Sequence, residues 1–454
     1  MISNEITGDY RKDALLEGLE FRWNHTAPVG TSVTVTFSFP SEAPAYADAE
    51  DKNGFQPYSA DQQQAVRGIL AMLSQQVGID FSEVADTASS YGDLRFSNND
   101  QMEKSSGYAL LPNTNGDASG DVYIDLQYST GVTPGSYQYA TLVHEIGHAL
   151  GLKHPGNYNG DEATDNTVMG NFLGVKEDKT IFTIMSYRES SQEIQGDWYA
   201  PYDILTLRYL YGGRAFNATE TTYNFTDAVG QKLNSLIDDG GNDTIDLSAL
   251  TAGAVLDLTP GGLSSIGRTV AGAETVQNLA IGVDTILENV VGTAYKDIIT
   301  VNAASNQVDG GAGVDFVLYN DSVTSHSITK NGSVFIVSGA NDSDSLVNVE
   351  RVIFSDKKLA LDLDGNAGLV AKLLGTVFGK DAVKVPEYVG IGLNLIDGGM
   401  SYSELMQLAL NERLGAGFTN EAEVDLLFTN LAGSLPSATD RATFAGAIAA
   451  GQFT

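Results

Sequence analysis

Three of the five histidines of this chain stand close together, in the segment His144-Glu145-Ile146-Gly147-His148-Ala149-Leu150-Gly151-Leu152-Lys153-His154. His144 and His148 are four residues apart, so on a helix they share one face and can reach the same metal ion. Gly151 tolerates the left-handed conformation that ends a helix, so the chain can turn back and bring in His154 as a third ligand. Three nitrogen ligands leave a fourth tetrahedral position to water, as in a catalytic zinc site. The segment therefore predicts zinc as a cofactor.

Glu145 stands beside the first of these histidines and is not expected to be a ligand. Zinc lowers the pKa of water to roughly 7, and a neighbouring carboxylate can then take the proton as a general base. We assign that catalytic role to Glu145. A helix that begins near residue 137 should carry the site, because one of its faces is apolar: Leu142, Ile146, Ala149 and Leu150.

The pattern HExxHxxGxxH resembles the metzincin clan of zinc endopeptidases, whose second mark is a tight turn that contains a methionine. Thr183-Ile184-Met185-Ser186-Tyr187 matches that turn, and the wording HEIGHALGLKHPG and IMSY most resembles the serralysin group. The resemblance implies that Tyr187 is a further zinc ligand that also stabilises the oxyanion, and that Met185 packs beneath the histidines. Arg188 stands where relatives usually carry an aromatic residue.

The charge balance bears on the class of partner. The chain has 25 basic and 58 acidic residues and a formal net charge of −33, which argues against nucleic acid. This acidity suits a protein that binds divalent cations. No apolar run approaches the ~18 residues of a membrane span, so we expect no membrane insertion. The chain has no cysteine, which in an extracellular protein leaves bound metal ions as the substitute for disulfides.

Residues 1–220 are expected to form an α+β metzincin protease domain. Alternating apolar residues predict strands, and the capping box of Ser59 and Gln62 predicts the start of a helix. The expected elements are a helix at 10–18, a strand at 33–39, a helix from Ser59 to Gly78, strands at 94–96 and 122–126, the histidine helix, and a helix at 201–212.

The segment Gly107-Tyr108-Ala109-Leu110-Leu111-Pro112 lies between those strands. In the resembled family the matching segment is an edge strand, and the substrate adds to it in antiparallel orientation. We therefore expect Tyr108, Ala109 and Leu110 to bind substrate, mainly through the main chain. The alternative is an internal strand with no role in substrate binding.

After residue 220 the sequence changes to short β-branched runs with a period of nine. Asp297, Asn306 and Asp315 are nine residues apart, and apolar residues follow each of them by two: Ile299, Val308 and Val317. Residues 310–315 match the GGxGxDxUx repeat of calcium-binding parallel β-rolls. We expect a short calcium-binding β-roll over 221–360, with a β-sandwich as the alternative. The predicted calcium ligands are Asp297, Gly310, Ala312 and Asp315.

Residues 361–454 return to helical periodicity and resemble helical modules at the ends of other nonapeptide-repeat secreted proteins. Ser401 with Glu404 and Ser437 with Asp440 predict two helix starts. Residues 362–366 offer some oxygen ligands for calcium, but a turn is the favoured interpretation. Serralysins are exported by an uncleaved C-terminal signal, and residues 1–21 do not form an N-terminal signal peptide, so secretion by that route is expected.

The predicted fold class is an α+β metzincin catalytic domain, then a parallel β-roll or β-sandwich domain, then an all-α C-terminal region. The predicted protein is a monomeric, secreted zinc endopeptidase that hydrolyses extracellular proteins or peptides, with a proteinaceous inhibitor as a further partner. Two alternatives remain. One is a calcium-dependent adhesion or surface-layer module that retains a metzincin scaffold, and the other is a protease dedicated to a single partner protein.

Overall fold

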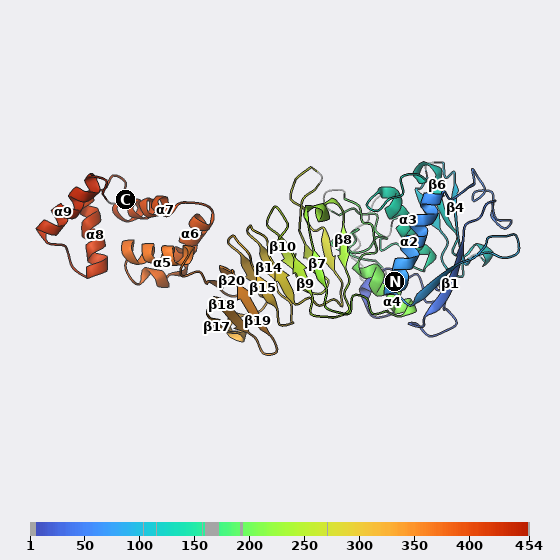
Figure 1. Cartoon of the computed structure of the whole chain (residues 1–454), viewed down its shortest axis with the longest axis horizontal. Helices are drawn as coiled ribbons and strands as arrows, with labels where there is room; N and C mark the ends of the chain where they lie inside the picture. The colour runs from blue at the N-terminus through green and yellow to red at the C-terminus, as the bar shows by residue number, and fades with distance from the viewer. Residues whose placement is uncertain are drawn as a thin grey trace. The chain divides into compact units, whose positions relative to one another are not determined.

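The computed structural model describes residues 6–102, 104–114, 116–156, 158, 172–190, 194–269 and 271–452. Its contacts group into two compact units, Met1–Gly313 with Ser325–Val347, and Val314–Thr324 with Asn348–Thr454. Figure 1 shows the elements of both units in chain order. The helices of the first unit are α1 (Tyr10–Asp13), α2 (Ala60–Gln76), α3 (Tyr137–Ala149) and α4 (Pro201–Tyr211).

The first unit begins with a six-stranded mixed sheet in the order β3-β1-β4-β6-β5, with β2 paired to β4. Strands β1, β3, β4 and β6 are parallel, and β5 is antiparallel to β6 at the edge. The bounds are β1 (Val33–Ser38), β2 (Gln56–Pro57), β3 (Ile79–Glu83), β4 (Leu94–Asn99), β5 (Gly107–Ala109) and β6 (Val122–Asp125).

Helices α2 and α3 pack on this sheet and share one hydrophobic core with it. The α2 helix begins as predicted at the capping box, in which Ser59 Oγ accepts from the N–H of Gln62 at 3.3 Å and Gln62 Oε1 accepts from the N–H of Ser59 at 3.0 Å. The buried face of α2 contributes Val66, Ile69, Leu70 and Leu73, and that of α3 contributes Leu142, Val143 and Ile146. The mixed α and β content predicted for this region is confirmed.

The predicted helix at 10–18 is wrong in length, because α1 ends at Asp13. Ala14, Leu15 and Leu16 are all buried in the core. Three consecutive buried side chains do not fit one face of a helix, and the chain leaves the helix in a turn, in which the N–H of Leu15 donates to the carbonyl oxygen of Lys12 at 2.9 Å. Leu16 pairs with Leu152 in a β-bridge, which ties the N-terminal segment to the turn after α3.

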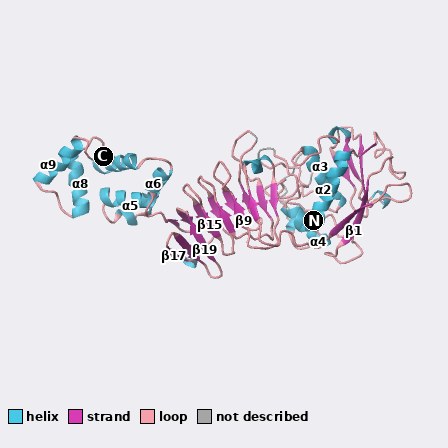
Figure 2. Ribbon diagram, viewed as in Figure 1, coloured by secondary structure: helices cyan, strands magenta, loops and turns pink. Residues whose placement is uncertain are grey.

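The rest of the first unit is built from short strands, drawn as successive magenta arrows in Figure 2. Strands β7, β9, β13, β15 and β19 pair in parallel, and β18 and β17 extend the sheet as an antiparallel hairpin. The bounds are β7 (Thr222–Asn224), β8 (Asn234–Leu236), β9 (Thr244–Asp246), β10 (Val255–Asp257), β11 (Leu263–Ser264), β12 (Leu279–Ile281), β13 (Asn289–Val291), β14 (Ile298–Thr300), β15 (Gln307–Asp309), β17 (Ser327–Asn331), β18 (Val334–Ser338) and β19 (Ser343–Val347).

The predicted period of nine appears in the strand positions. Strands β13, β14 and β15 begin at residues 289, 298 and 307. β13 pairs with β15, whereas β14 pairs with β10 in another sheet. The middle residue of each strand is buried: Val290, Ile299 and Val308. Alternate strands therefore enter two different parallel sheets, which favours the β-roll over the antiparallel β-sandwich.

The second unit contains a three-stranded sheet segment and a helical region. Both predicted helix starts are confirmed, since Ser401 and Ser437 cap α7 and α9. Asp362 accepts from Arg351 and from the N–H of Ala367, so residues 362–366 form a turn that leads into α5. The bounds are β16 (Phe316–Leu318), β20 (Arg351–Ile353), β21 (Lys358–Ala360), α5 (Asn366–Val377), α6 (Pro386–Asp397), α7 (Tyr402–Leu414), α8 (Asn420–Ala432) and α9 (Ala438–Ala449).

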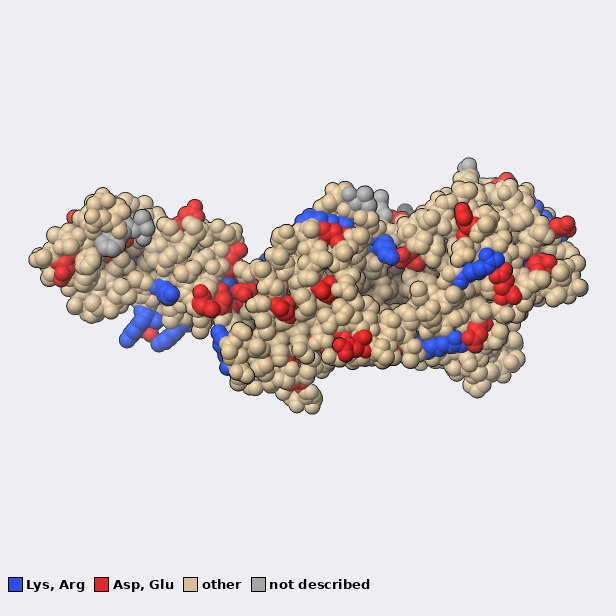
Figure 3. Space-filling model, in the orientation of Figure 1, with Lys and Arg blue, Asp and Glu red and all other residues tan. Residues whose placement is uncertain are grey.

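The charged side chains are interspersed on the face drawn in Figure 3, where acidic and basic groups alternate with uncharged surface. That face carries no broad basic area of the kind that binds nucleic acid. Among the described residues, every helix is too short or too polar to span a membrane.

Candidate metal centre and cleft

The three histidines of the predicted zinc site converge. His144 and His148 project from α3, and His154 follows the turn after it. Nε2 of His154 lies 3.1 Å from Nε2 of His144 and 3.0 Å from Nε2 of His148. Nitrogen ligands of a tetrahedral zinc ion lie about 3.3 Å from one another, given Zn–N distances of about 2.0–2.1 Å. The donor set therefore fits zinc.

Main-chain carbonyl groups set the orientation of two of these rings. Nδ1 of His144 donates to the carbonyl oxygen of Ile184 at 2.8 Å, and Nδ1 of His148 donates to that of Leu152 at 2.7 Å. A proton on Nδ1 leaves the lone pair of Nε2 free for a metal ion. Burial lowers the pKa of His144 to about 4 and that of His154 to about 3, so both rings are neutral at physiological pH. Neutral imidazole is the form that binds zinc.

The path of the chain around the histidines depends on glycine at two positions, one in the turn after α3 and one within α3. Gly151 has a φ of 103°, and a Cβ there would lie 2.3 Å from the carbonyl oxygen of Phe21. A Cβ at Gly147 would lie 2.7 Å from Sδ of Met185. Only glycine fits both the conformation of the first position and the close contacts at both.

The methionine turn lies directly under the histidines, and Met185 is fully buried there. Asp203 on α4 holds this turn: its carboxylate accepts from Thr183 Oγ1 at 2.6 Å and from the N–H of Ile184 at 2.8 Å. The carbonyl oxygen of Ile184 in turn accepts from His144. A single buried carboxylate thus fixes the residue that orients the first histidine.

Tyr187 lies against His144 and His154, as the spacing after Met185 predicts. Its ring centroid is 4.3 Å from that of His154 and 5.8 Å from that of His144. The residue is 61% exposed, whereas burial of its hydroxyl and the nearby Glu145 raise its pKa to about 12. The neutral hydroxyl is therefore a hydrogen-bond donor at physiological pH.

Glu145 is buried between α3 and the edge strand. A Cβ at Gly107 of β5 would lie 3.0 Å from Cγ of Glu145, so the glycine makes room for the carboxylate. Oε2 of Glu145 is buried and has no hydrogen-bond partner among the described residues. Burial raises the pKa of Glu145 to about 8. An acid that is buried beside a cleft, with an oxygen not used by the protein, is a candidate for proton transfer.

A cleft with a volume of 400 Å³ opens beside the histidines. It includes His144, Glu145 and Tyr187, but not the predicted substrate-binding residues Tyr108, Ala109 and Leu110. Most residues that line this cleft were not predicted from the sequence. Several of them directly precede β5 or follow the methionine turn, and this position in the chain could have indicated them. The walls of this cleft are formed by Lys104, Ser105, Ser106, Gly107, Tyr137, Ala140, Thr141, Thr180, Ile184, Ser186, Glu189, Gln195 and Gly196.

Comparison with known proteins shows which proteins this chain is similar to. Residues 200–367 match the family described as Peptidase M10 serralysin C terminal. Serralysin of Proteus mirabilis is 32% identical over 316 residues, which are 63% of this chain and 62% of the relative. Serralysin G of Dickeya chrysanthemi is 30% identical over 344 residues, 67% of this chain and 66% of the relative. The chain is serralysin-like.

A more distant relative extends the same relationship. Metalloprotease AprA of Pseudomonas entomophila (strain L48) is 27% identical over 311 residues, 63% of this chain and 62% of the relative. The serralysin-like chain thus spans less than two thirds of the length of these curated relatives.

The predicted calcium ligands of this serralysin-like chain lie in both compact units. In the first, Oδ1 of Asp297 accepts from the N–H of Ala254 at 2.7 Å and Oδ2 from that of Thr293 at 2.6 Å. A Cβ at Gly292 would meet both the carbonyl oxygen of Gly310 at 2.4 Å and Oδ2 of Asp297 at 2.7 Å, so these two oxygens lie near each other.

The other two predicted calcium ligands, Ala312 and Asp315, are described by their main-chain hydrogen bonds. The N–H of Ala312 donates to the carbonyl oxygen of Thr293 at 3.2 Å in the first unit. Asp315 belongs to the second unit, where it is fully buried and its N–H donates to Glu350 at 2.9 Å. The structure therefore brings together Asp297 and Gly310 as oxygen donors, and calcium binding remains a prediction.

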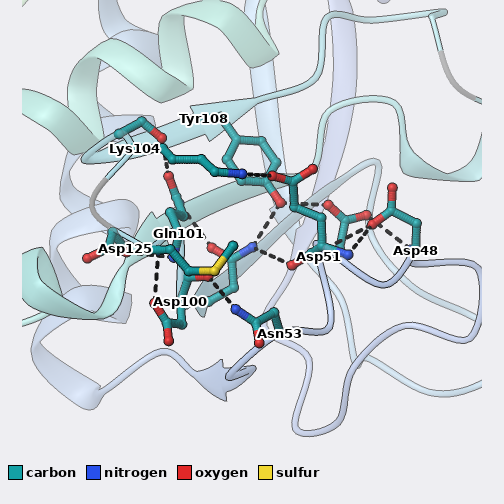
Figure 4. Close-up of polar contacts among 12 residues, drawn as sticks. Asp48, Asp51, Asn53, Asp100, Gln101, Lys104, Tyr108 and Asp125 are labelled. Carbon is teal, nitrogen blue, oxygen red and sulfur yellow. Dashed lines mark hydrogen bonds and ion pairs between the residues drawn. The ribbon is translucent and has the colours of Figure 1, made fainter.

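The edge strand β5 is held by a cluster of polar side chains (Figure 4). The hydroxyl of Tyr108 donates to Asp51 at 2.6 Å and accepts from Asn99 at 2.8 Å. Its ring stacks on Tyr123 of β6 with centroids 4.9 Å apart. Lys104, just before the strand, pairs with Glu50 at 3.4 Å. The side chain of Tyr108 is thus an anchor for the strand and is engaged by protein partners.

We expect Gly151→Ala to destabilise the fold and weaken zinc binding. A side chain in the left-handed region costs about 1–2 kcal/mol, and the contact with Phe21 adds to that cost. Urea unfolding and zinc content measure the two effects. Gly174→Ala is the matched control, since a Cβ there meets nothing within 4 Å. Equal stability and equal zinc content in the two variants would contradict the role of Gly151.

We also expect Asp203 to make stability depend on pH. Burial raises its pKa from 3.8 to about 7, although three hydrogen bonds act in the opposite direction. A carboxyl with a raised pKa stabilises the folded state while protonated, and this contribution is lost as the pH rises from 3.8 through 7. The unfolding free energy of wild type relative to Asp203→Asn, measured in urea at fixed metal content, should therefore fall from pH 4 to pH 8. A difference that does not change with pH would refute the raised pKa.

Proposed function

We propose that this protein is a secreted, zinc-dependent endopeptidase of the metzincin type that cleaves extracellular proteins. The convergence of three neutral histidines, with Nε2 of His154 at 3.0–3.1 Å from Nε2 of the other two, carries this proposal, together with the buried glutamate and the open cleft beside them. The serralysin relatives support the same activity.

In this proposal the three histidines hold zinc, and Tyr187 is a fourth protein ligand. When bound, zinc supplies Lewis-acid activation of water and of the scissile carbonyl. Glu145 takes a proton from the attacking water and delivers it to the leaving amine. The positive charge of a bound ion lowers the pKa of a carboxyl nearby, so the pKa of about 8 that burial gives Glu145 is brought toward the working range of a base. The hydroxyl of Tyr187 donates a hydrogen bond to the developing oxyanion.

The substrate in this proposal is an extended peptide that adds to the open edge of β5. Among the described residues, β5 pairs only with β6, so its other edge is available for main-chain hydrogen bonds. Recognition through the main chain permits many side-chain sequences. We extend the proposal to three functional regions, namely the protease over 1–220, a calcium-binding β-roll over 221–360, and a helical module over 361–454 that serves export.

The alternative of an adhesion module with a vestigial site lacks support. Such a module would be expected to have lost a ligand or the base, and His144, His148, His154 and Glu145 are all present. The protease dedicated to one partner protein differs only in substrate range, so digestion of a mixture of proteins separates it from a protease of broad range.

We expect Glu145→Ala to keep zinc and the fold but to lose activity on casein by about 10²–10⁴-fold, the usual contribution of a general base. The measurement is casein hydrolysis by wild type and variant, with zinc content and melting temperature recorded on both. Glu412→Ala, an exposed position on α7, is the control and should behave as wild type. Unchanged turnover in Glu145→Ala would refute the assignment of the base. Zinc in both proteins with no casein hydrolysis by wild type would point instead to a dedicated substrate.

We expect Tyr108→Phe to raise KM several-fold and to leave kcat almost unchanged. The change removes the hydrogen bonds to Asp51 and Asn99 but keeps the stacked ring, so β5 is held less firmly for the substrate. Tyr46→Phe is the matched control, because it also removes a hydroxyl bound to an aspartate, Asp121, but does not touch β5. A KM that changes equally in both variants would show that β5 is not the binding edge.

A further inference from the structure

Tyr187 has an aromatic neighbour besides the histidines. The ring of Tyr158 stacks on that of Tyr187, with centroids 4.6 Å apart and an angle of 18° between the planes. The hydroxyl of Tyr158 also accepts from the main-chain N–H of Tyr187 at 3.2 Å. Tyr158 therefore contacts both the side chain and the backbone of the residue that lies over the histidines.

Tyr158 is itself held by a buried carboxylate. Its hydroxyl donates to Oδ1 of Asp178, a residue that is only 1% exposed. The same carboxylate accepts from Oγ of Ser186 at 2.7 Å and from Nε of Arg188 at 3.2 Å. Ser186 and Arg188 flank Tyr187 in the chain, so Asp178 fixes Tyr158 and both neighbours of Tyr187 with one set of hydrogen bonds.

Arg188 makes this arrangement possible for a buried acid. A carboxylate that is removed from water needs either a counter-charge or several donors. Asp178 has both, because the guanidinium of Arg188 is its ion-pair partner and two hydroxyl groups complete its hydrogen bonds. Arg188 therefore stabilises the support of Tyr158.

We propose that Tyr158 is a positioning residue that holds the ring of Tyr187 over the metal centre. This inference rests on the proposed function, in which Tyr187 binds zinc and then serves the oxyanion. The ring of Tyr187 also contacts His154 and His144, but the side chain is 61% exposed, so the stack on Tyr158 contributes to how often the ring is in place. Stacked aromatic pairs of this kind change such a population by a factor of about 2 to 12.

Copper substitution gives a direct reading of this position. A phenolate bound to Cu(II) has a charge-transfer absorption band in the visible region, so the band of the copper-loaded protein measures the fraction of Tyr187 that is bound. The proteins compared are wild type, Tyr187→Phe, Tyr158→Phe and Tyr158→Leu. Melting temperature and copper content of each protein report on fold and loading, and kcat and KM are measured on the zinc forms.

The aromatic ring of Tyr158, and not its hydroxyl, should determine the strength of the charge-transfer band. We expect the band in wild type, its absence in Tyr187→Phe, its retention in Tyr158→Phe, and a fall of about 2- to 12-fold in Tyr158→Leu, where the aromatic pair is lost. kcat should fall in parallel in Tyr158→Leu, while KM stays close to that of wild type.

Three results would overturn the inference. A full band and full kcat in Tyr158→Leu would refute it and leave the proposed function intact. An equal loss in Tyr158→Phe and Tyr158→Leu would refute stacking as the cause, because the phenylalanine keeps the ring. A wild-type protein with casein activity but without the band would refute the binding of Tyr187 to the metal ion, and the positioning role with it. Absence of both band and activity in copper-loaded and zinc-loaded wild type would instead refute the proposed function.

Discussion

Three uncharged imidazole rings, with Nε2 of His154 at 3.0–3.1 Å from Nε2 of the other two, are the constraint to which the surrounding structure is adapted. Bringing them together needs a helix that places two rings on one face and a turn that reverses the chain within a few residues. The helix needs a buried apolar face, which the sheet supplies, and the turn needs Gly151, where Phe21 leaves no space for a side chain. The N-terminal segment is therefore part of the site, because it forms the wall against which the turn closes.

Around this centre, two buried carboxylates are satisfied by protein donors. Asp203 accepts three hydrogen bonds and holds the methionine turn, and Asp178 accepts three and holds the loop on which Tyr187 lies. Such fully bonded carboxylates rigidify the segments that they hold. Glu145 is the exception, since Oε2 has no partner among the described residues. Burial of an oxygen without a partner costs folding free energy, but here it leaves Oε2 of Glu145 available for proton transfer.

The sequence was sufficient to predict those structural features that follow from the spacing of residues close together in the chain. The capping box at Ser59, the helix that carries His144, and the nine-residue strand period all follow from residues close together in the chain. What could not be predicted depends on contacts between distant segments. Asp51 and Tyr108 are 57 residues apart, and Tyr158 and Asp178 are 20 apart. No periodicity marks such pairs, so the support of β5 and of Tyr187 emerged only from the structure. α1 ended early for the same reason, because its apolar residues are buried by distant partners.

The β-roll shows how an imperfect repeat can still give a regular fold. The middle copy has Asn306 where the flanking copies have Asp297 and Asp315. Nδ2 of Asn306 donates to the carbonyl oxygens of Leu287 at 3.0 Å and Glu288 at 3.2 Å, which a carboxylate cannot do. Its Oδ1 accepts from the N–H of Asn302 at 3.2 Å. An amide thus satisfies both donors and acceptors of the turn with protein groups alone, whereas an aspartate at this position would need a cation or another donor beside those carbonyls. The nine-residue strand period is kept although this copy departs from the repeat sequence, because the side chain of Asn306 still forms hydrogen bonds with the main chain of a neighbouring turn.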